Sequence, residues 1–335
     1  MEILDAAVPG TLVRHHLSPR ELPARAIDVW LPPGAHASGG GVRPVVYCHD
    51  GQNLFLPAFS FAGVPWSMHT AALIAAEATG RPAPIVVGVW NVGELRANEY
   101  LPPEPELRPT GTGLLQRDRA AAAGRRCADA YVRMLAEEVL PLIEAEHGAS
   151  TRPQDRIVLG SSMGGLASIY CAVTRQGLFG GAGCVSTNFI IGGDPLVDWF
   201  AARMPEPGRV RLWFDRGTET LDGEYGPTQD RMDRALRASP LVEGRDWVSR
   251  VFPGREHSEG AWAARVPEIL EFLLAGQRSA GVATGQQRPR QSPRAGRPAT
   301  AAGQRRPVDD GLPTAAGRLP VSGGRSSGPS TLVDR

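Results

Sequence analysis

The sequence contains no lysine, so its basic side chains, apart from histidine, are all arginine. Acidic and basic residues nearly balance, and the formal net charge of +1 gives no general reason to expect binding to nucleic acid or to a membrane surface. No apolar run approaches the ~18 residues that a membrane-spanning helix needs. The N-terminal residues, MEILDAAVPG, lack a basic segment followed by an apolar core, so we expect no secretory signal.

Cysteine is scarce and scattered along the chain. The four cysteines are Cys48, Cys127, Cys171 and Cys184, and none of them has metal-ligand spacing. Cys48 and Cys171 fall within stretches that we predict to be buried. We therefore expect reduced core cysteines, no metal site and a cytoplasmic location.

The composition of the chain changes at Gly276. Residues 276–335 consist mainly of Gly, Pro, Ser, Arg, Ala and Gln and contain almost no large apolar residues. Such a segment has too little to bury to offset its conformational entropy. We expect residues 1–275 to form one domain and residues 276–335 to be a disordered tail, solvated rather than bound to an acidic partner.

Short apolar runs alternate with helical patterns through the first domain. The predicted strands are residues 11–17, 26–31, 45–48, 84–90, 157–159, 181–186, 210–214 and 247–252. The predicted helices are residues 68–79, 128–147, 166–173, 195–204, 229–236 and 260–274, and residues 91–126 read as a long aperiodic loop. The alternation predicts a leading antiparallel pair and then a mostly parallel central sheet with helices on both faces.

The most informative stretch is Gly160-Ser161-Ser162-Met163-Gly164, which has the pattern G-x-S-x-G. An apolar strand precedes it and an Ala-rich helix follows. A turn this sharp strains the backbone and exposes the central hydroxyl, and it requires small neighbours. We therefore expect Ser162 to be a nucleophile, with the amide of Met163 at the helix N-terminus stabilising an oxyanion.

A serine nucleophile needs a base, and histidine has a suitable pKa. His257 follows the last predicted strand, where the α/β-hydrolase order of serine, acid and histidine places the base. The acid should follow the strand 210–214. The candidates are Asp215, Glu219, Asp222 and Glu224, of which Asp215 is expected to lie still within the end of the strand.

A second oxyanion donor is expected in the turn His49-Asp50-Gly51-Gln52-Asn53, which follows an earlier strand. Gly51 permits close approach of the backbone to a ligand. We take the amide of Gly51 or Gln52 as the donor and Asp50 as a further residue of the binding site.

Several motifs occur together in a specific order. They are HDGQNLF at 49–55, Trp66, IVVGVWN at 85–91, R-x-x-E-Y-x-P at 96–102, GSSMGG at 160–165, GTETLDGEY at 217–225 and FPGREHSEGAWAARV at 252–266. With these motifs the chain resembles the putative-esterase family of α/β-hydrolases over about residues 10–275. That family includes esterase D-like enzymes, feruloyl esterase domains and enterochelin (siderophore) esterases.

The resemblance implies an α/β-hydrolase fold with Ser162 as nucleophile and His257 as base. It also implies that Arg96, Glu99 and Tyr100 shape the entrance of the active site. The match to an L-D-x-x-Y pattern favours Asp222 as the acid, with Glu219 as the runner-up.

The predicted activity is hydrolysis of a carboxylic ester by a serine esterase (EC 3.1.1 type) through an acyl-enzyme. The substrate would be a small molecule, either a simple ester, a feruloyl ester or a siderophore lactone, and neither a metal nor an organic cofactor is needed. One alternative is an acyltransferase with the same triad, in which an alcohol replaces water. A second is a non-catalytic binding protein on the same scaffold, against which the complete set of Ser, His and acid argues.

Overall fold

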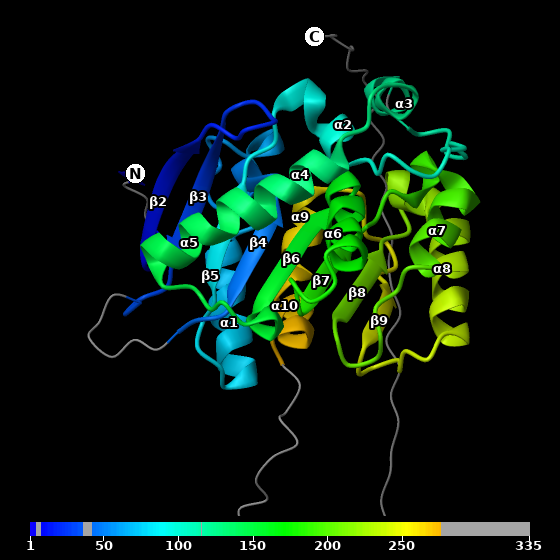
Figure 1. Cartoon of the computed structure of the whole chain (residues 1–335). Coiled ribbons are helices and arrows are strands. Elements are labelled where there is room, and N and C mark those ends of the chain that lie inside the picture. The colour runs from blue at the N-terminus through cyan, green and yellow to red at the C-terminus, as the bar shows by residue number, and fades with distance from the viewer. Residues whose placement is uncertain (5–7, 36–41, 115, 276–335) are drawn as a thin grey trace, which may run out of the picture. The chain divides into compact units, whose positions relative to one another are not determined.

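A computed structural model describes residues 1–4, 8–35, 42–114 and 116–275 (Figure 1). The predicted tail, 276–335, lies outside these residues. The described strands form one sheet in the order β1-β2-β3-β5-β4-β6-β7-β8-β9. Their bounds are β1 Glu2–Leu4, β2 Thr11–Leu17, β3 Arg25–Leu31, β4 Val45–His49, β5 Ile85–Val89, β6 Arg156–Ser161, β7 Gly181–Val185, β8 Arg211–Arg216 and β9 Trp247–Val251.

The sheet is antiparallel at its N-terminal side and parallel elsewhere. The β1–β2, β2–β3 and β3–β5 pairs are antiparallel, whereas the β5–β4, β4–β6, β6–β7, β7–β8 and β8–β9 pairs are parallel. The predicted leading pair is thus confirmed, and β1 extends it. Because β4 and β6 to β9 share one direction, the segments that follow them emerge at one edge of the sheet.

Helices cover both faces of the sheet (Figure 1). Their bounds are α1 Met68–Thr79, α2 Arg96–Tyr100, α3 Gln116–Ala123, α4 Ala128–Met134, α5 Leu140–His147, α6 Met163–Thr174, α7 Gly193–Ala201, α8 Gly226–Ala238, α9 Glu259–Ala263 and α10 Val266–Leu274. Buried residues of α1, α9 and α10 form a core cluster on one face, and those of α4 to α8 join the larger cluster on the other.

Strand β6 shows how the sequence produces this two-sided core. Val158 packs in the larger cluster, whereas Ile157 and Leu159 pack in the smaller one. Side chains alternate between the faces of a strand, so a strand covered on both sides must be apolar at every position. The run Ile157-Val158-Leu159 meets that requirement.

The prediction that residues 91–126 form an aperiodic loop was wrong. This segment contains a 3₁₀ turn at Gly93–Leu95 and the helices α2 and α3. Helix α2 is too short to show a period, and α3, with the sequence QRDRAAAA, combines polar and charged residues with alanines and has no stripe of large apolar residues. A search for apolar periodicity misses helices of both kinds.

Proline changes the winding of two other predicted helices. Residues 128–147 are helical throughout, but a π turn at Leu135–Val139 precedes Pro141, which cannot donate a backbone hydrogen bond. The predicted helix 260–274 is divided into α9 and α10, and Pro267 lies in the first turn of the second. Proline is tolerated in a first turn because its missing N–H would have no partner there.

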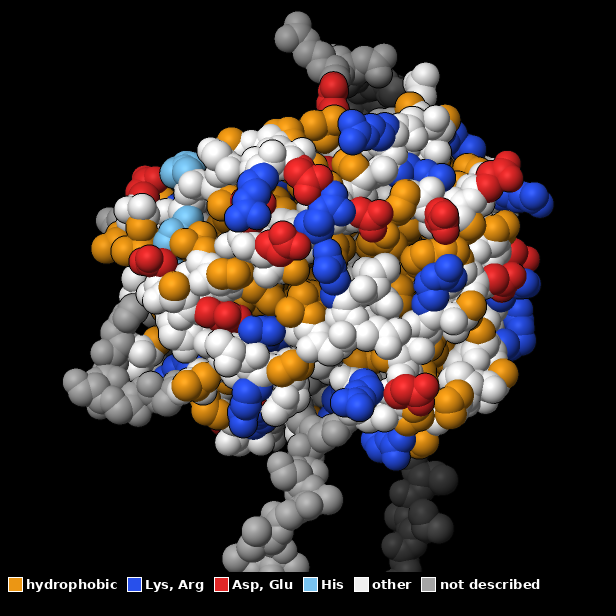
Figure 2. Space-filling model, viewed as in Figure 1, with side chains coloured by type: hydrophobic (Ala, Val, Ile, Leu, Met, Phe, Trp, Pro, Cys, Tyr) orange, Lys and Arg blue, Asp and Glu red, His pale blue; other side chains and the backbone are white. Residues whose placement is uncertain are grey.

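The described residues show where the cysteines and the charged side chains lie. Cys48, Cys171 and Cys184 are buried, Cys127 is half-buried, and all four are free thiols. Acidic and basic side chains are interspersed over the face seen in Figure 2. Within residues 1–4, 8–35, 42–114 and 116–275, no helix has the length and apolar character needed to cross a membrane.

Candidate active site

Ser162 lies at the junction between β6 and α6. Its backbone angles, φ 58° and ψ −118°, are a combination that residues other than glycine rarely adopt. The Ser162 amide donates to the Val185 carbonyl at 2.9 Å, and the Ser162 carbonyl accepts from the Asn188 amide at 3.1 Å. Strain of this kind persists where surrounding contacts over-determine the backbone, and it is common at active sites.

Gly160 and Gly164 make the sharp turn at residues 160–164, the serine elbow, sterically possible. A Cβ at Gly160 would lie 2.9 Å from the backbone of Gly164 and from the His49 ring, closer than side chains approach. A Cβ at Gly164 would lie 3.3 Å from Asp50 Oδ2. The two glycines therefore bring the turn after β4 against the N-terminal end of α6.

Met163 is the first residue of α6. Its amide belongs to the first helical turn, where N–H groups have no partner within the helix and carry positive partial charge. Its side chain is buried, and Asn188 Nδ2 lies 3.5 Å from the sulfur. The buried side chain anchors the helix start beside Ser162.

Asp222 and His257 are in direct contact. His257 Nδ1 lies 2.6 Å from Asp222 Oδ1, and the other carboxylate oxygen, Oδ2, accepts from Ser186 Oγ at 2.7 Å and from the Gly217 amide at 2.5 Å. Asp222 follows β8 and His257 follows β9, at the same sheet edge as Ser162. An ionised carboxylate can only accept, so Nδ1 carries the proton of this bond and Nε2 is left free to act as a base.

The hydrogen bonds to Asp222 keep it ionised. Burial alone would raise its pKa, but donation from His257, Ser186 and the Gly217 amide outweighs burial and holds the pKa of Asp222 below its ordinary value. The carboxylate is therefore negative at neutral pH and can stabilise an imidazolium.

The other acid candidates lie elsewhere. Asp215 is within β8, as predicted, and pairs with Arg265 at 2.8 Å. Glu219 is exposed, and its carboxylate accepts from Thr218 Oγ1 at 3.1 Å. Glu224 accepts from the Thr112 and Gly113 amides at 2.7 and 2.9 Å.

The loops that carry Asp222 and His257 are bound to each other. The His257 amide donates to Thr220 Oγ1 at 2.8 Å, and Thr218 N donates to the Arg255 carbonyl at 3.0 Å. A Cβ at Gly217 would overlap that same carbonyl, so glycine is required where the two loops meet. These contacts make the acid and the base one rigid unit.

Two aromatic rings enclose the His257 imidazole. The Trp262 ring lies edge-on at 4.8 Å between centroids and the Tyr225 ring at 5.5 Å. Burial and the nearby Asp222 charge raise the pKa of Tyr225 well above its ordinary value, so its hydroxyl stays protonated. The hydrophobic walls limit the freedom of the imidazole without taking up its Nε2.

The turn Asp50–Asn53 is held by polar side chains from the segment after β5. Asp50 has φ 56°, and its carboxylate accepts a bidentate pair from Arg96 at 2.7 Å and a bond from Asn91 Nδ2 at 2.7 Å. Gln52 Oε1 accepts from the Asn91 amide at 3.3 Å. A Cβ at Gly51 would overlap the Gly88 backbone, so only glycine allows this turn to rest on β5.

The three residues of the R-x-x-E-Y motif have different environments. Arg96 pairs with Asp50, and the Tyr100 hydroxyl lies 3.3 Å from Asp50 Oδ1. Glu99 faces the interior and forms a fully buried ion pair with Arg25 of β3 at 2.7 Å. The structure thus brings Arg96 and Tyr100 to the Asp50 turn but not Glu99.

Four residues near Asp222 and His257 were not identified from the sequence: Ser186, Trp262, Arg265 and Glu259. Ser186 follows β7, but no pattern like the one around Ser162 marks it, and the predicted strand 181–186 included it. Trp262 and Arg265 lie within the quoted motif at 252–266. Glu259 is half-buried beside His257, and burial raises its pKa.

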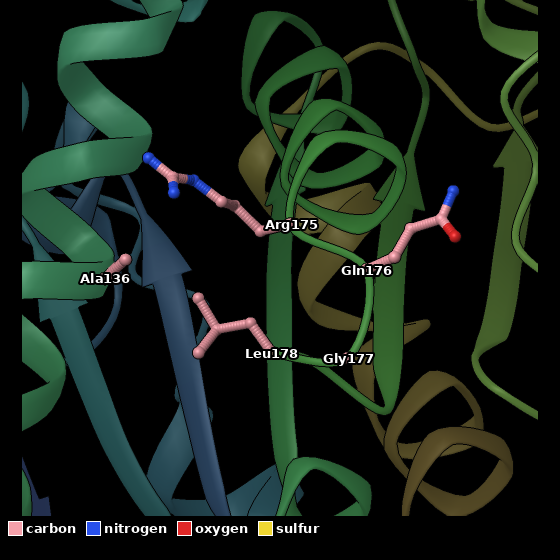
Figure 3. Close-up of a pocket in the computed structure, with 5 residues that line it drawn as sticks. All are labelled: Ala136, Arg175, Gln176, Gly177 and Leu178. Atoms are coloured by element: carbon pink, nitrogen blue, oxygen red, sulfur yellow. The ribbon is translucent and has the colours of Figure 1, made fainter.

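A hollow of about 290 Å³ lies away from these residues (Figure 3). It is lined by Ala136, Arg175, Gln176, Gly177 and Leu178. Arg175 follows the C-terminal end of α6, so the hollow is ~18 Å along the helix axis from Ser162. With neither a carboxylate nor a histidine in its lining, it has no acid–base pair.

In the part of the chain that the structure describes, no group of three or more His, Cys, Asp and Glu could hold a metal ion.

His49, at the end of β4, is buried beneath the Asp50 turn with Nδ1 2.8 Å from the Tyr131 hydroxyl. Burial lowers the pKa of His49 from 6.5 to about 4, so the folded state binds fewer protons than the unfolded state between these values. Lowering the pH through this range therefore favours the unfolded state, in which the imidazole is protonated. We predict that this histidine lowers the free energy of unfolding by about 2 kcal/mol at pH 5 relative to its value above pH 6.5. Denaturant unfolding at pH 7.5 and 5.0 should show a smaller loss for His49→Gln than for the wild type, and equal losses would contradict the assignment.

The contact between Asp222 and His257 predicts unequal effects of two substitutions. Removing the triad aspartate charge costs ~10⁴-fold in kcat in the serine-protease precedent. We expect Asp222→Asn to lower kcat at least ~100-fold and Glu219→Gln to lower it less than ~10-fold, measured with p-nitrophenyl acetate. The reverse order would transfer the role to Glu219, and small effects at both would indicate a dyad of Ser162 and His257.

Residues 23–273 match the model of a family described as "Putative esterase". A curated relative, "Uncharacterized protein YbbA" of Bacillus subtilis (strain 168), is 25% identical over 270 residues, which are 78% of this chain and 98% of the relative.

Two of the similar solved structures are hydrolases. An "IroE-like serine hydrolase" from Shewanella oneidensis superposes with a TM-score of 0.62 at 17% identity, covering 78% of this chain and 79% of that one. "Siderophore hydrolase EstA" from Aspergillus nidulans gives a TM-score of 0.59 at 14% identity, covering 81% and 97%. At these identities the likeness shows the fold, and the predicted α/β-hydrolase fold is confirmed.

Proposed function

Because the chain belongs to the putative-esterase family, we propose that it hydrolyses a small carboxylic ester through a covalent acyl-enzyme on Ser162. The observation that supports this mechanism best is the 2.6 Å contact between His257 Nδ1 and Asp222 Oδ1 at the edge of the sheet where Ser162 lies. The contact orients a histidine suited to act as a base at the sheet edge where Ser162 is held in a strained turn.

In the first half-reaction, Ser162 Oγ attacks the ester carbonyl while His257 Nε2 accepts the hydroxyl proton. The imidazolium is stabilised by the ionised Asp222. The tetrahedral intermediate then collapses, the bond to the alcohol breaks, and Nε2 returns the proton to the leaving oxygen.

In the second half-reaction, His257 takes a proton from water and the resulting hydroxide attacks the acyl-enzyme. Collapse releases the carboxylic acid and returns the proton to Ser162. Neither half-reaction needs a metal or an organic cofactor.

The negative oxygen of each intermediate requires donors that are already in place. We assign this role to the Met163 amide and to the amide of Gly51 or Gln52. The support is that the Asp50–Asn53 turn rests against the elbow at Gly164 and is held there by Arg96. Burial alone would raise the pKa of Asp50, but the charge and hydrogen bonds of Arg96 lower it, so both charges of this pair are retained.

Replacing the nucleophile tests the mechanism. Loss of a serine nucleophile costs ~10⁶-fold in kcat in a subtilisin series. We expect Ser162→Ala to abolish hydrolysis of p-nitrophenyl acetate and labelling by a fluorophosphonate, with a melting temperature close to that of the wild type. Activity within tenfold of wild type would refute the mechanism.

We further propose that the segment 91–126 forms a wall over the substrate site. Arg108 N donates to the Gly192 carbonyl at 3.0 Å, and Thr110 N donates to the Ile190 carbonyl at 2.9 Å. Beyond these contacts, Glu224 binds Thr112 and Gly113 through three hydrogen bonds. Because Glu224 is two residues from Asp222, the wall is attached next to the triad acid.

Releasing the wall should alter selectivity more than stability. We expect Glu224→Ala to change the ratio of kcat/KM between p-nitrophenyl acetate and a bulky aryl ester by at least ~5-fold, a modest free-energy effect that a few lost surface hydrogen bonds can supply. Glu219→Ala, on the same loop, is the matched control, because the Glu219 carboxylate accepts from Thr218 alone among the described residues. An unchanged ratio in Glu224→Ala would make the segment a passive loop.

A further inference from the structure

Ser186 lies between the nucleophile and the acid. It follows β7, the strand between β6 and β8, and it is completely buried. Its φ of 40° is unusual for a residue with a side chain. Its amide donates to Asp215 Oδ1 at 3.0 Å, which holds the residue in this conformation.

The neighbours of the Ser186 hydroxyl determine where its proton points. Trp262 Nε1 lies 3.0 Å from Ser186 Oγ, and Arg265 Nη2 lies 3.3 Å from it. An indole N–H and a guanidinium can only donate, so together they occupy both lone pairs of the hydroxyl oxygen. The single hydroxyl proton must then be donated to the remaining neighbour, Asp222 Oδ2, at 2.7 Å.

Arg265 is held firmly in this arrangement. Its Nη1 donates to Asp215 Oδ1 at 2.8 Å and its Nε donates to the Ala261 carbonyl at 3.1 Å, and both partners of the ion pair are buried. Asp215 also accepts from Trp213 Nε1 at 2.7 Å. A buried arginine with this many partners cannot turn away from Ser186 without leaving a charge uncompensated.

We propose that Ser186 is a positioning residue of the triad, which, with Arg265 and Trp262 behind it, holds the Asp222 carboxylate as a hydrogen-bond acceptor facing His257. Oδ2 is occupied by Ser186 and the Gly217 amide, so Oδ1 is presented to Nδ1 in one orientation. This proposal rests on the proposed hydrolytic function and extends it to a second layer of residues.

Replacing Ser186 with alanine tests the role. A hydrogen bond to a charged group corresponds to a ~10- to 100-fold change in rate. We expect Ser186→Ala to lower kcat for p-nitrophenyl acetate by that factor and to leave KM within ~2-fold, because the serine acts on the base and not on the substrate. In an Asp222→Asn background the same substitution should lower kcat by less than ~2-fold, since residues that act as a unit are not additive.

The chain offers a matched control at the other end of the sheet. Ser150 is also completely buried, and it also donates to a buried aspartate, Asp155, at 2.8 Å. Ser150→Ala removes the same kind of bond away from the triad and should leave kcat unchanged. Ser186→Gly provides a second variant that lacks the hydroxyl but tolerates the positive φ, in case the alanine variant does not fold.

Two results would overturn the proposal: a kcat within ~3-fold of wild type in folded Ser186→Gly, or the same loss of kcat in the wild-type and Asp222→Asn backgrounds. The pH profile of kcat/KM adds a further readout, because its acidic limb should move with Ser186→Ala and not with Ser150→Ala. The charged and titratable groups around this limb are Asp222, Glu259 and Tyr225 beside His257, and Arg265 and Asp215 behind Asp222. Failure here would leave the Ser162→Ala result standing, so the two proposals are separable.

Discussion

The sharp turn at Ser162 is the constraint on which the rest of the site depends. A residue with a side chain at φ 58° is stable only if its neighbours hold it there, and the end of β7 does so through Val185 and Asn188. Ser186, in the same short segment, binds Asp222. The segment 185–188 thus contacts both the proposed nucleophile and the proposed acid, although neither belongs to β7. A parallel sheet allows this because the ends of three adjacent strands meet at one edge.

Three buried aspartates around this edge differ in whether their partner side chain can exchange a proton near neutral pH. Asp50 pairs with Arg96, Asp215 with Arg265, and Asp222 with His257. A buried carboxylate needs a positive or hydrogen-bonding partner, and all three have one. Arginine keeps its proton throughout the physiological range, so the cation of the first two pairs does not exchange a proton. Histidine exchanges its proton near neutrality, which makes the third pair the one suited to proton transfer.

Local patterns in the sequence predicted the strands, the elbow and the order of serine and histidine, because each depends on neighbouring residues. The burial of Glu99 against Arg25 was not predictable, since that ion pair joins α2 to a strand far away in the chain. The same holds for the contacts of Ser186, whose partners come from β8, the turn after β8, α9 and the residue before α10. Helix α3 was missed for a different reason, because its sequence QRDRAAAA has no periodic pattern of large apolar residues. Sequence reasoning therefore located the edge of the sheet where the site lies, but not the layer of residues behind it.

The short 3₁₀ turn Thr220–Glu224 explains why one acidic residue in this loop meets the histidine and another does not. Residues three apart in a 3₁₀ turn lie on the same side, so Asp222 and Tyr225 both face His257. Glu224 points elsewhere and binds the wall at Thr112 and Gly113. The same few residues thus contact both His257 and the segment that contains Thr112 and Gly113.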